Sequence, residues 1–241
     1  MHPSLKSIEL NITNKCNRSC LFCPQSQGFG GTDFMSPDIA KIVNSQLGED
    51  YSGRITLSGF GEPLLNPHLE DIIKSIEYWN VILITNGDAI TKKRVDSLID
   101  AGLKKIRISL YDDSNLKNIH ECLNGKIRYS ILDYTTSPIH IVNRNEIYNK
   151  VEASTDSLKC YIPSYKMFID WDGEVRLCAN DWRGVLSFGN IYKTPINDIW
   201  LSKEFNKYRF KNRTETPCNV CKVNGTMRGK ESYKELLCIK S

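Results

Sequence analysis

Three cysteines lie close together near the start of the chain, in the stretch TNKCNRSCLFCPQ. Cys16, Cys20 and Cys23 are so close in sequence that they cannot all be disulfide partners. Tetrahedral zinc in a structural site needs a fourth ligand nearby. Three thiolates instead suit a cubane [4Fe–4S] cluster that leaves one iron open for a substrate or cofactor. An incidental cysteine cluster or a zinc loop is the alternative.

A second set of cysteines lies in the C-terminal third of the chain. Its members are Cys160, Cys178, Cys218 and Cys221. Cys178 ends the run WDGEVRLC (171–178), which predicts a β-hairpin with Asp172 and Gly173 at its turn. The last two cysteines form a CxxC pair. Four such thiolates can close a zinc site or hold an iron–sulfur cluster, so the spacing alone does not choose the metal.

The elements that position these cysteines follow an alternating pattern up to about residue 145. Runs rich in β-branched residues predict strands at 6–13, 54–59, 80–86, 104–111, 127–133 and 140–143. Amphipathic stretches predict helices at 36–47, 68–79 and 91–102. Ser36 is the expected N-cap of the first helix and Gly102 the stop of the third. Alternating strands and helices indicate a parallel sheet whose C-terminal edge gathers the functional loops.

Polar residues follow several of these strands. After the second strand, GFGEPLLNP (59–67) places Gly61 where the backbone can approach a ligand, and Glu62 can hold an ammonium group. A simple turn is the alternative for this stretch. Asn86, in TNGD, is either a turn residue or a polar contact. Arg144 follows the sixth strand and offers a rigid fork of donors for a carboxylate or hydroxyl oxygen, unless it is a solvated loop residue.

Composition and charge limit the possible partners. The chain has 241 residues, 40% of them hydrophobic and 25% charged, which is typical of globular proteins. The net charge of +4 is mild, so nucleic acid has no support as a partner. The longest apolar run, VILI at 81–84, is too short to span a membrane. Nine cysteines without a secretion signal predict metal or redox use in a reducing compartment, the cytoplasm.

The N-terminal motifs resemble those of the radical S-adenosylmethionine (SAM) superfamily. Its signature is CxxxCxΦC after the first strand of a partial barrel, and Phe22 is the aromatic residue Φ. The resemblance implies that Cys16, Cys20 and Cys23 hold a [4Fe–4S] cluster whose open iron chelates SAM, which one electron cleaves to a 5′-deoxyadenosyl radical. Phe60 replaces the first glycine of the family's GGE motif.

The resemblance also assigns further residues to the SAM site. Glu62 would bind the amino group of the methionine moiety. Ser109 and Tyr111, at the end of the fourth strand, would lie where relatives contact the ribose. We therefore expect an α/β fold, with a partial (β/α)6 barrel over residues 1–150 and a small α+β domain over residues 151–241.

The C-terminal motifs resemble the SPASM/twitch extension of the same family. The order Cys, GxxxxC, CxxC and the stretch GNIYKTPINDIW (189–200) carry this resemblance. A full SPASM domain has further cysteines downstream, but position 227 is Met227 and only Cys238 follows. The resemblance therefore implies a twitch domain with one auxiliary [4Fe–4S] cluster, held by Cys160, Cys178, Cys218 and Cys221.

Along its whole length the chain resembles short radical SAM enzymes that oxidise a secondary alcohol. This implies hydrogen abstraction from a carbinol carbon of a sugar or aminocyclitol, loss of the hydroxyl proton, and transfer of an electron to the auxiliary cluster. The implied partners are a carbohydrate-like small molecule and an electron donor such as flavodoxin or ferredoxin.

Two remaining cysteines generate a rival hypothesis. Some related enzymes invert a stereocentre of a sugar or a peptidyl residue and use a cysteine thiol as the hydrogen donor. Cys122 or Cys238 would serve in such an epimerase. However, Cys122 lies at helical spacing with Leu116 and Ile119, which favours a buried apolar role. A non-catalytic iron–sulfur or zinc binding module is the last alternative, because it would leave the strand-end residues idle.

Overall fold

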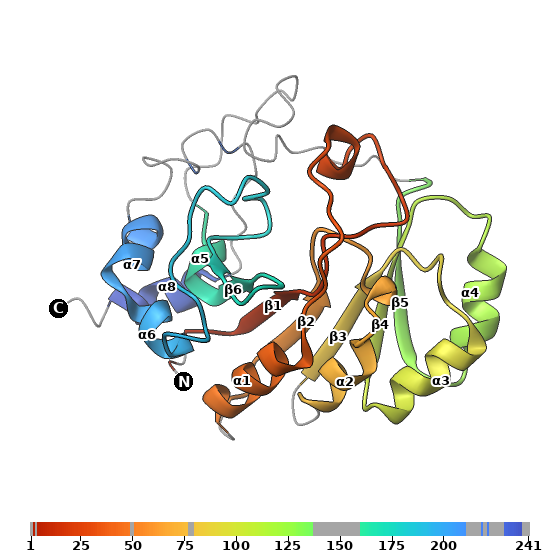
Figure 1. Cartoon of the computed structure of the whole chain (residues 1–241), viewed down its shortest axis with the longest axis horizontal. Coiled ribbons are helices and arrows are strands. Elements are labelled where there is room, and N and C mark those ends of the chain that lie inside the picture. Colours follow the sequence, from red (N-terminus) through yellow and green to blue (C-terminus); the bar gives the residue numbers. More distant parts are fainter. Residues whose placement is uncertain are drawn as a thin grey trace.

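The protein is built around one open sheet of seven strands, shown in Figure 1. The structure, a computed structural model, describes residues 2, 4–48, 51–76, 80–136, 160–210, 218, 221 and 229–237. The sheet order is β5-β4-β3-β2-β1-β6-β7. The strands are β1 (Ser7–Asn11), β2 (Arg54–Ser58), β3 (Asn80–Thr85), β4 (Lys105–Leu110), β5 (Arg128–Asp133), β6 (Lys166–Ile169) and β7 (Val175–Arg176).

The described sheet confirms the expected open barrel architecture. Strands β1 to β6 pair in parallel, and β7 alone among the described strands pairs antiparallel, with β6. Five of the predicted strands are present, each within two residues of its expected bounds. The sixth predicted strand (140–143) and the expected domain boundary near residue 150 lie outside the described residues.

Four helices follow β1 to β4 in the chain and cover the outer side of the sheet (Figure 1). They are α1 (Pro37–Leu47), α2 (Leu69–Lys74), α3 (Lys92–Asp100) and α4 (Leu116–Leu123). As predicted, Ser36 caps α1, because its side chain accepts a hydrogen bond from the amide of Asp38. Helix α2 is shorter than the predicted 68–79, since it ends at Lys74.

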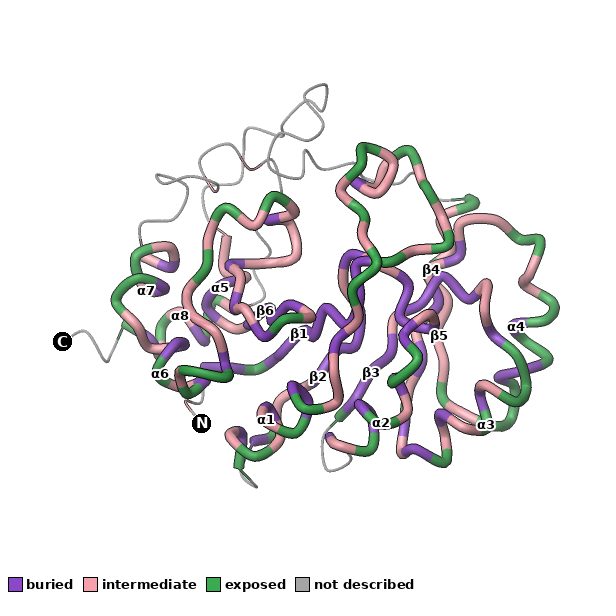
Figure 2. The backbone as a smooth tube through the Cα atoms, in the orientation of Figure 1, coloured by how far each residue is buried: buried purple, intermediate pink, exposed green. Residues whose placement is uncertain are grey.

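The two faces of the sheet differ in polarity because side chains alternate along each strand. Ile8 and Leu10 of β1, together with Ile55 and Leu57 of β2, are fully buried in the core. The alternate positions of the same strands carry polar residues: Glu9, Asn11, Thr56 and Ser58. The apolar face is therefore used for packing, and the polar face remains for the site. Figure 2 shows β1 and β2 as buried along almost their whole length.

The C-terminal part continues the same sheet. The predicted hairpin is present, with β6 and β7 joined by a turn in which Gly173 has φ +83°. Strand β6 pairs with β1, so the hairpin extends the barrel sheet on the side away from β2. The helices of this part are α5 (Ile162–Tyr165), α6 (Ile196–Leu201), α7 (Lys203–Phe210) and α8 (Lys230–Leu237). None of the described helices is both long and apolar enough to cross a membrane.

A buried arginine joins three of these helices. Arg209 of α7 is fully buried and donates to the carbonyl oxygen of Pro163 at 2.7 Å and to that of Trp200. It also donates to the side chain of Asn206 at 2.7 Å. Its guanidinium carbon lies 3.9 Å from the ring centre of Trp200 and 4.2 Å from that of Phe205. A planar fork of donors that also stacks on aromatic rings is specific to arginine.

We expect Arg209→Lys to destabilise the protein. Lysine keeps the positive charge but cannot donate in three fixed directions or stack as a plane, so a buried charge loses its partners. The free energy of unfolding should fall by roughly 2–4 kcal/mol, measured by urea denaturation. Arg128→Lys, at an exposed position of β5, is the matched control and should change little. Equal stability of the two variants would contradict this role of Arg209.

Candidate active site

One pocket at the C-terminal edge of the sheet brings together the predicted cofactor residues. The loop after β1 carries the three N-terminal cysteines, and Figure 1 shows it rising above the strands. Cys16, Cys20 and Cys23 all line the pocket. The remaining predicted residues of the SAM site line it as well: Phe22, Gly61, Glu62, Asn86, Ser109 and Tyr111. Predicted residues up to 95 positions apart in the sequence therefore share one cavity.

The turn after β2 lies directly against the cysteine loop. The amide of Glu62 donates a hydrogen bond of 2.8 Å to the carbonyl oxygen of Lys15, next to Cys16. A Cβ atom at position 61 would overlap this carbonyl oxygen and approach that of Thr13. Only glycine at position 61 allows the two backbones to come this close.

Glu62 is the buried carboxylate of the pocket, with 2% of its surface exposed. One carboxylate oxygen accepts from the hydroxyl of Thr85 at 2.5 Å and from the amide of Leu64 at 2.9 Å. The other accepts from the amide of Asn86 at 2.8 Å. Burial nevertheless raises the pKa of Glu62 to about 6, because desolvation outweighs these hydrogen bonds. The site is thus prepared for a cation that would compensate the buried charge.

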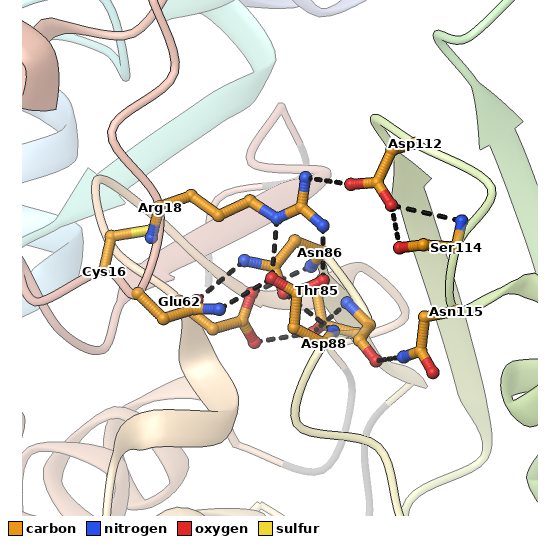
Figure 3. Close-up of polar contacts among 11 residues, drawn as sticks. Cys16, Arg18, Glu62, Thr85, Asn86, Asp88, Asp112, Ser114 and Asn115 are labelled. Atoms are coloured by element: carbon orange, nitrogen blue, oxygen red, sulfur yellow. Dashed lines mark hydrogen bonds and ion pairs between the residues drawn. The ribbon is translucent and has the colours of Figure 1, made fainter.

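An ion-pair network fixes the cysteine loop to the ends of β3 and β4, as Figure 3 shows. Arg18, between Cys16 and Cys20, donates to both carboxylate oxygens of Asp88 at 2.6 and 2.5 Å. It also pairs with Asp112 at 2.7 Å. A bidentate arginine–carboxylate pair is strongly directional, so it sets the orientation of the loop. Sequence reasoning missed this network, although Asp88 ends the TNGD stretch that it had singled out.

Aromatic rings form part of the pocket wall. Phe22 lies 5.1 Å from Tyr111 between ring centres, and Tyr111 stacks on Tyr134 at 5.3 Å. Burial raises the pKa of Tyr111 to about 12, so its hydroxyl stays protonated near neutral pH. Trp182, from the C-terminal part, also lines the pocket. Sequence reasoning did not single out Trp182, because no spacing relates it to the N-terminal motifs.

The second set of cysteines lines a separate small pocket. Cys160, Cys178, Cys218 and Cys221 meet there, with Ile162, Pro163 and Leu177 as apolar neighbours. Cys160 lies just before α5, Cys178 lies just after β7, and the other two form the CxxC pair. Burial raises the pKa of the Cys178 thiol, so a bound metal is needed to hold it as a thiolate.

The number of cysteines in each pocket matches what an iron–sulfur cluster needs. Zinc requires its sulfur ligands within about 2.3 Å of one point. In a cubane cluster, each cysteine binds a different iron, so the sulfurs can surround a cavity. Three cysteines in one pocket and four in the other match an open and a closed cluster.

The rival cysteines and the predicted arginine have different outcomes. Cys122 of α4 is buried in the core, donates to the side chain of Asn118 at 3.5 Å and lines neither pocket. Arg144 and Cys238 lie outside the described residues.

Two family models match this sequence. The radical SAM superfamily model matches residues 10–132. The SPASM model, an iron–sulfur cluster-binding domain, matches residues 160–222. The two matches contain all seven cysteines of the two pockets.

Known proteins with similar sequences cover the chain to different extents. The S-adenosyl-L-methionine-dependent 2-deoxy-scyllo-inosamine dehydrogenase of Niallia circulans is 29% identical over 250 residues, which cover 98% of this chain and 100% of that protein. A probable GTP 3′,8-cyclase of Methanococcus maripaludis is 40% identical over 111 residues, which cover 44% of this chain and 36% of that protein.

Solved structures agree with these matches. The crystal structure of BtrN in complex with AdoMet and 2-DOIA has a TM-score of 0.81 and 28% identity, and the match covers 92% of this chain and 95% of that chain. Native anSMEcpe with bound AdoMet shares the fold, with a TM-score of 0.59 at 13% identity over 96% of each chain. The chain therefore belongs to the radical SAM superfamily, with SAM and a [4Fe–4S] cluster as cofactors of its barrel and a SPASM-type iron–sulfur domain after it.

Proposed function

We propose that this protein is a radical SAM dehydrogenase that oxidises a secondary alcohol of a sugar-like or aminocyclitol ring to a ketone. One observation carries the proposal: the similarity to the 2-deoxy-scyllo-inosamine dehydrogenase extends over 98% of the chain and includes both cysteine sets. The similarity to the GTP cyclases covers only 44% of the chain and therefore supports the family but not the reaction.

Different residues of the pocket would bind different parts of SAM and its cluster. Cys16, Cys20 and Cys23 would ligate the cluster and leave one iron open. Glu62 would accept hydrogen bonds from the amino group of SAM, which supplies the cation that its buried charge lacks. Asn86, Ser109 and Tyr111 would then contact the rest of the molecule, from the ends of β3 and β4.

The C-terminal pocket would hold the electron acceptor. Its four cysteines would fully ligate one cluster, so no iron would be left open for a substrate. When bound, SAM and its cluster supply a 5′-deoxyadenosyl radical that takes a hydrogen atom from the carbinol carbon. The auxiliary cluster supplies an acceptor for the second electron. The hydroxyl proton leaves to solvent or a base, and one SAM yields one ketone, one methionine and one 5′-deoxyadenosine. The chain itself contributes positioning and a shielded site.

The placement of Cys122 favours oxidation over an epimerisation that uses this thiol as the hydrogen donor. An epimerase needs a thiol within hydrogen-transfer reach of the substrate radical. Among the residues that the structure describes, the pocket contains no cysteine besides Cys16, Cys20 and Cys23. Cys122 is buried on the other side of the sheet, under α4. Oxidation needs no hydrogen donor, so this arrangement suffices for it.

The proposed reaction also needs an electron donor and a residue that orients the bound molecules. A flavodoxin or ferredoxin would deliver the electron that starts each reaction, in the cytoplasm, where thiols stay reduced. Arg144 remains our proposed residue for orienting a substrate or SAM oxygen.

The reaction can be tested with 2-deoxy-scyllo-inosamine, SAM and dithionite, without oxygen. We expect a ketone two mass units lighter than the substrate, formed with one equivalent each of 5′-deoxyadenosine and methionine. Mass spectrometry of product made in deuterated water distinguishes the alternatives. A product one mass unit heavier than the substrate, with a solvent-derived deuterium, would instead establish epimerisation and overturn the proposal.

The cluster assignment predicts the iron content of variants. Anaerobically reconstituted protein should contain about eight irons per chain, as two [4Fe–4S] clusters. Replacing Cys16, Cys20 and Cys23 by Ala should leave about four irons and abolish SAM cleavage, whereas Cys122→Ala should change neither. Zinc in the C-terminal pocket, or about four irons in the unmodified protein, would remove the auxiliary cluster from the proposal.

Glu62→Gln should weaken SAM binding by about 10- to 100-fold, because a charge-assisted hydrogen bond is lost. Both clusters should still assemble. The wild-type affinity should also decline as the pH falls through about 6, where Glu62 becomes protonated and can no longer pair with an ammonium group. The variant should lack this pH dependence.

Equilibrium binding of SAM, followed by the spectrum of the cluster, measures both effects. Glu70→Gln is the matched control, because Glu70 pairs with Arg94 on the outer helices at 2.9 Å and does not line the pocket. If Glu62→Gln binds SAM as the control does, Glu62 does not hold the amino group.

A further inference from the structure

The structure explains the residue that departs from the family's GGE motif. Phe60 replaces the first glycine, and its side chain is buried, with 8% exposed. Its ring centre lies 4.1 Å from that of Trp182 and 5.3 Å from that of Phe168. A glycine at position 60 would leave the indole of Trp182 without this contact. The departure is therefore matched by an aromatic partner from the C-terminal part of the chain.

Trp182 has a distinct place in the pocket. Among the described lining residues, it alone comes from beyond residue 111; the others belong to the cysteine loop and the ends of β2, β3 and β4. It is half-buried, so part of its ring contacts Phe60 and part remains available. The indole thus adds a flat apolar surface to the wall of the pocket, next to Phe60.

The loop that carries Trp182 is held in a fixed shape. Asp181, which is 1% exposed, accepts hydrogen bonds from the amides of Val185 at 3.0 Å and Leu186 at 3.1 Å. Its own amide donates to the carbonyl oxygen of Cys178 at 3.1 Å. These contacts fix the loop that leads from Cys178, a cysteine of the second pocket, to Trp182 four residues later. One rigid loop therefore joins the wall of the first pocket to a proposed ligand of the auxiliary cluster.

A further contact ties this loop to the cysteine loop. The guanidinium carbon of Arg183 lies 5.9 Å from the ring centre of Phe29. Trp182 and Arg183 thus contact the N-terminal part in two ways, through the ring pair of Trp182 with Phe60 and the cation–π contact of Arg183 with Phe29. Such pairs stabilise a specific relative placement of the two segments.

We propose that Trp182 is a specificity-determining residue that packs against the ring of the substrate, and that Phe60 is a positioning residue that acts through Trp182. This inference rests on the proposed function, because it assigns the substrate end of the same pocket. The C–H faces of a cyclitol or sugar ring are apolar enough to stack on an indole, while the hydroxyl groups at the ring edge bind polar residues. Contact with Trp182 places the ring between the SAM side of the pocket and the auxiliary cluster.

The test uses Trp182→Ala, Trp182→Phe and Trp171→Phe, with 2-deoxy-scyllo-inosamine as the probe. Trp171, in the turn of the preceding β6–β7 hairpin, is also half-buried but does not line the pocket, so it is the matched control. For Trp182→Ala we expect KM to rise about tenfold, and more SAM to be consumed per ketone formed. Trp182→Phe should be intermediate and the control unchanged. Iron content and the Kd of SAM, measured without substrate, should stay within about twofold of wild type.

A double-mutant cycle tests the role of Phe60. Phe60→Leu alone should raise KM, but it should add little in the Trp182→Ala background, because its effect requires the indole. Multiplicative effects would show that Phe60 acts independently and would overturn its role. A weaker Kd for SAM in Trp182→Ala would move Trp182 to the SAM site, and an unchanged KM would remove it from the substrate site. Both results overturn the inference.

The outcomes also separate this inference from the proposed function. Wild-type protein that binds the probe without oxidising it overturns only the proposed function, and the binding constants of the variants then decide the inference. Oxidation with equal KM in all variants overturns only the inference. Absence of binding to wild type overturns both.

Discussion

The close backbone contact between the Gly61–Glu62 turn and the cysteine loop is the constraint on which the site depends. The amide of Glu62 holds the carbonyl oxygen of Lys15, while the carboxylate of Glu62 holds Leu64, Thr85 and Asn86. One residue thus joins the loop after β1, the turn after β2 and the end of β3. The absence of a side chain at position 61 is what permits this approach. Burying the carboxylate is unfavourable by itself, so the fold holds in place a group that a bound cation would stabilise.

Arg18 supports this arrangement from the other side of the loop. Its pairs with Asp88 and Asp112 connect the loop to the ends of β3 and β4, and the side chains of Arg18 and Asp88 are only partly exposed. Exposed ion pairs contribute little to stability, but a bidentate pair that bridges separate loops fixes geometry. The cysteines on either side of Arg18 therefore face the pocket from a loop that is held at both ends. This is the kind of preorganisation that a cofactor with several points of attachment requires.

The continuity of the sheet brings the C-terminal part to the pocket. Strand β6 pairs with β1, and the buried side chain of Asn11 donates to Asp170 at 2.7 Å directly after β6. Asp170 in turn pairs with Arg176 at 3.0 Å, so the hairpin has a defined position relative to β1. From this hairpin the chain leads to Cys178 and then to Trp182, which returns to the first pocket. The two cysteine pockets are thus linked through one sheet and one loop.

The sequence by itself determined the features that depend on local pattern or on spacing. The alternation of strands and helices, the Ser36 cap, the turn at Gly173 and the two cysteine sets all follow from residues close together in the chain. The sequence also predicted which strand-end residues would meet, because parallel strands end at one edge of a sheet. Tertiary structure alone decided the Arg18 network, the clamp at Arg209 and the pairing of Phe60 with Trp182. Each of these joins residues far apart in the chain through side-chain contacts, and no periodicity records such contacts.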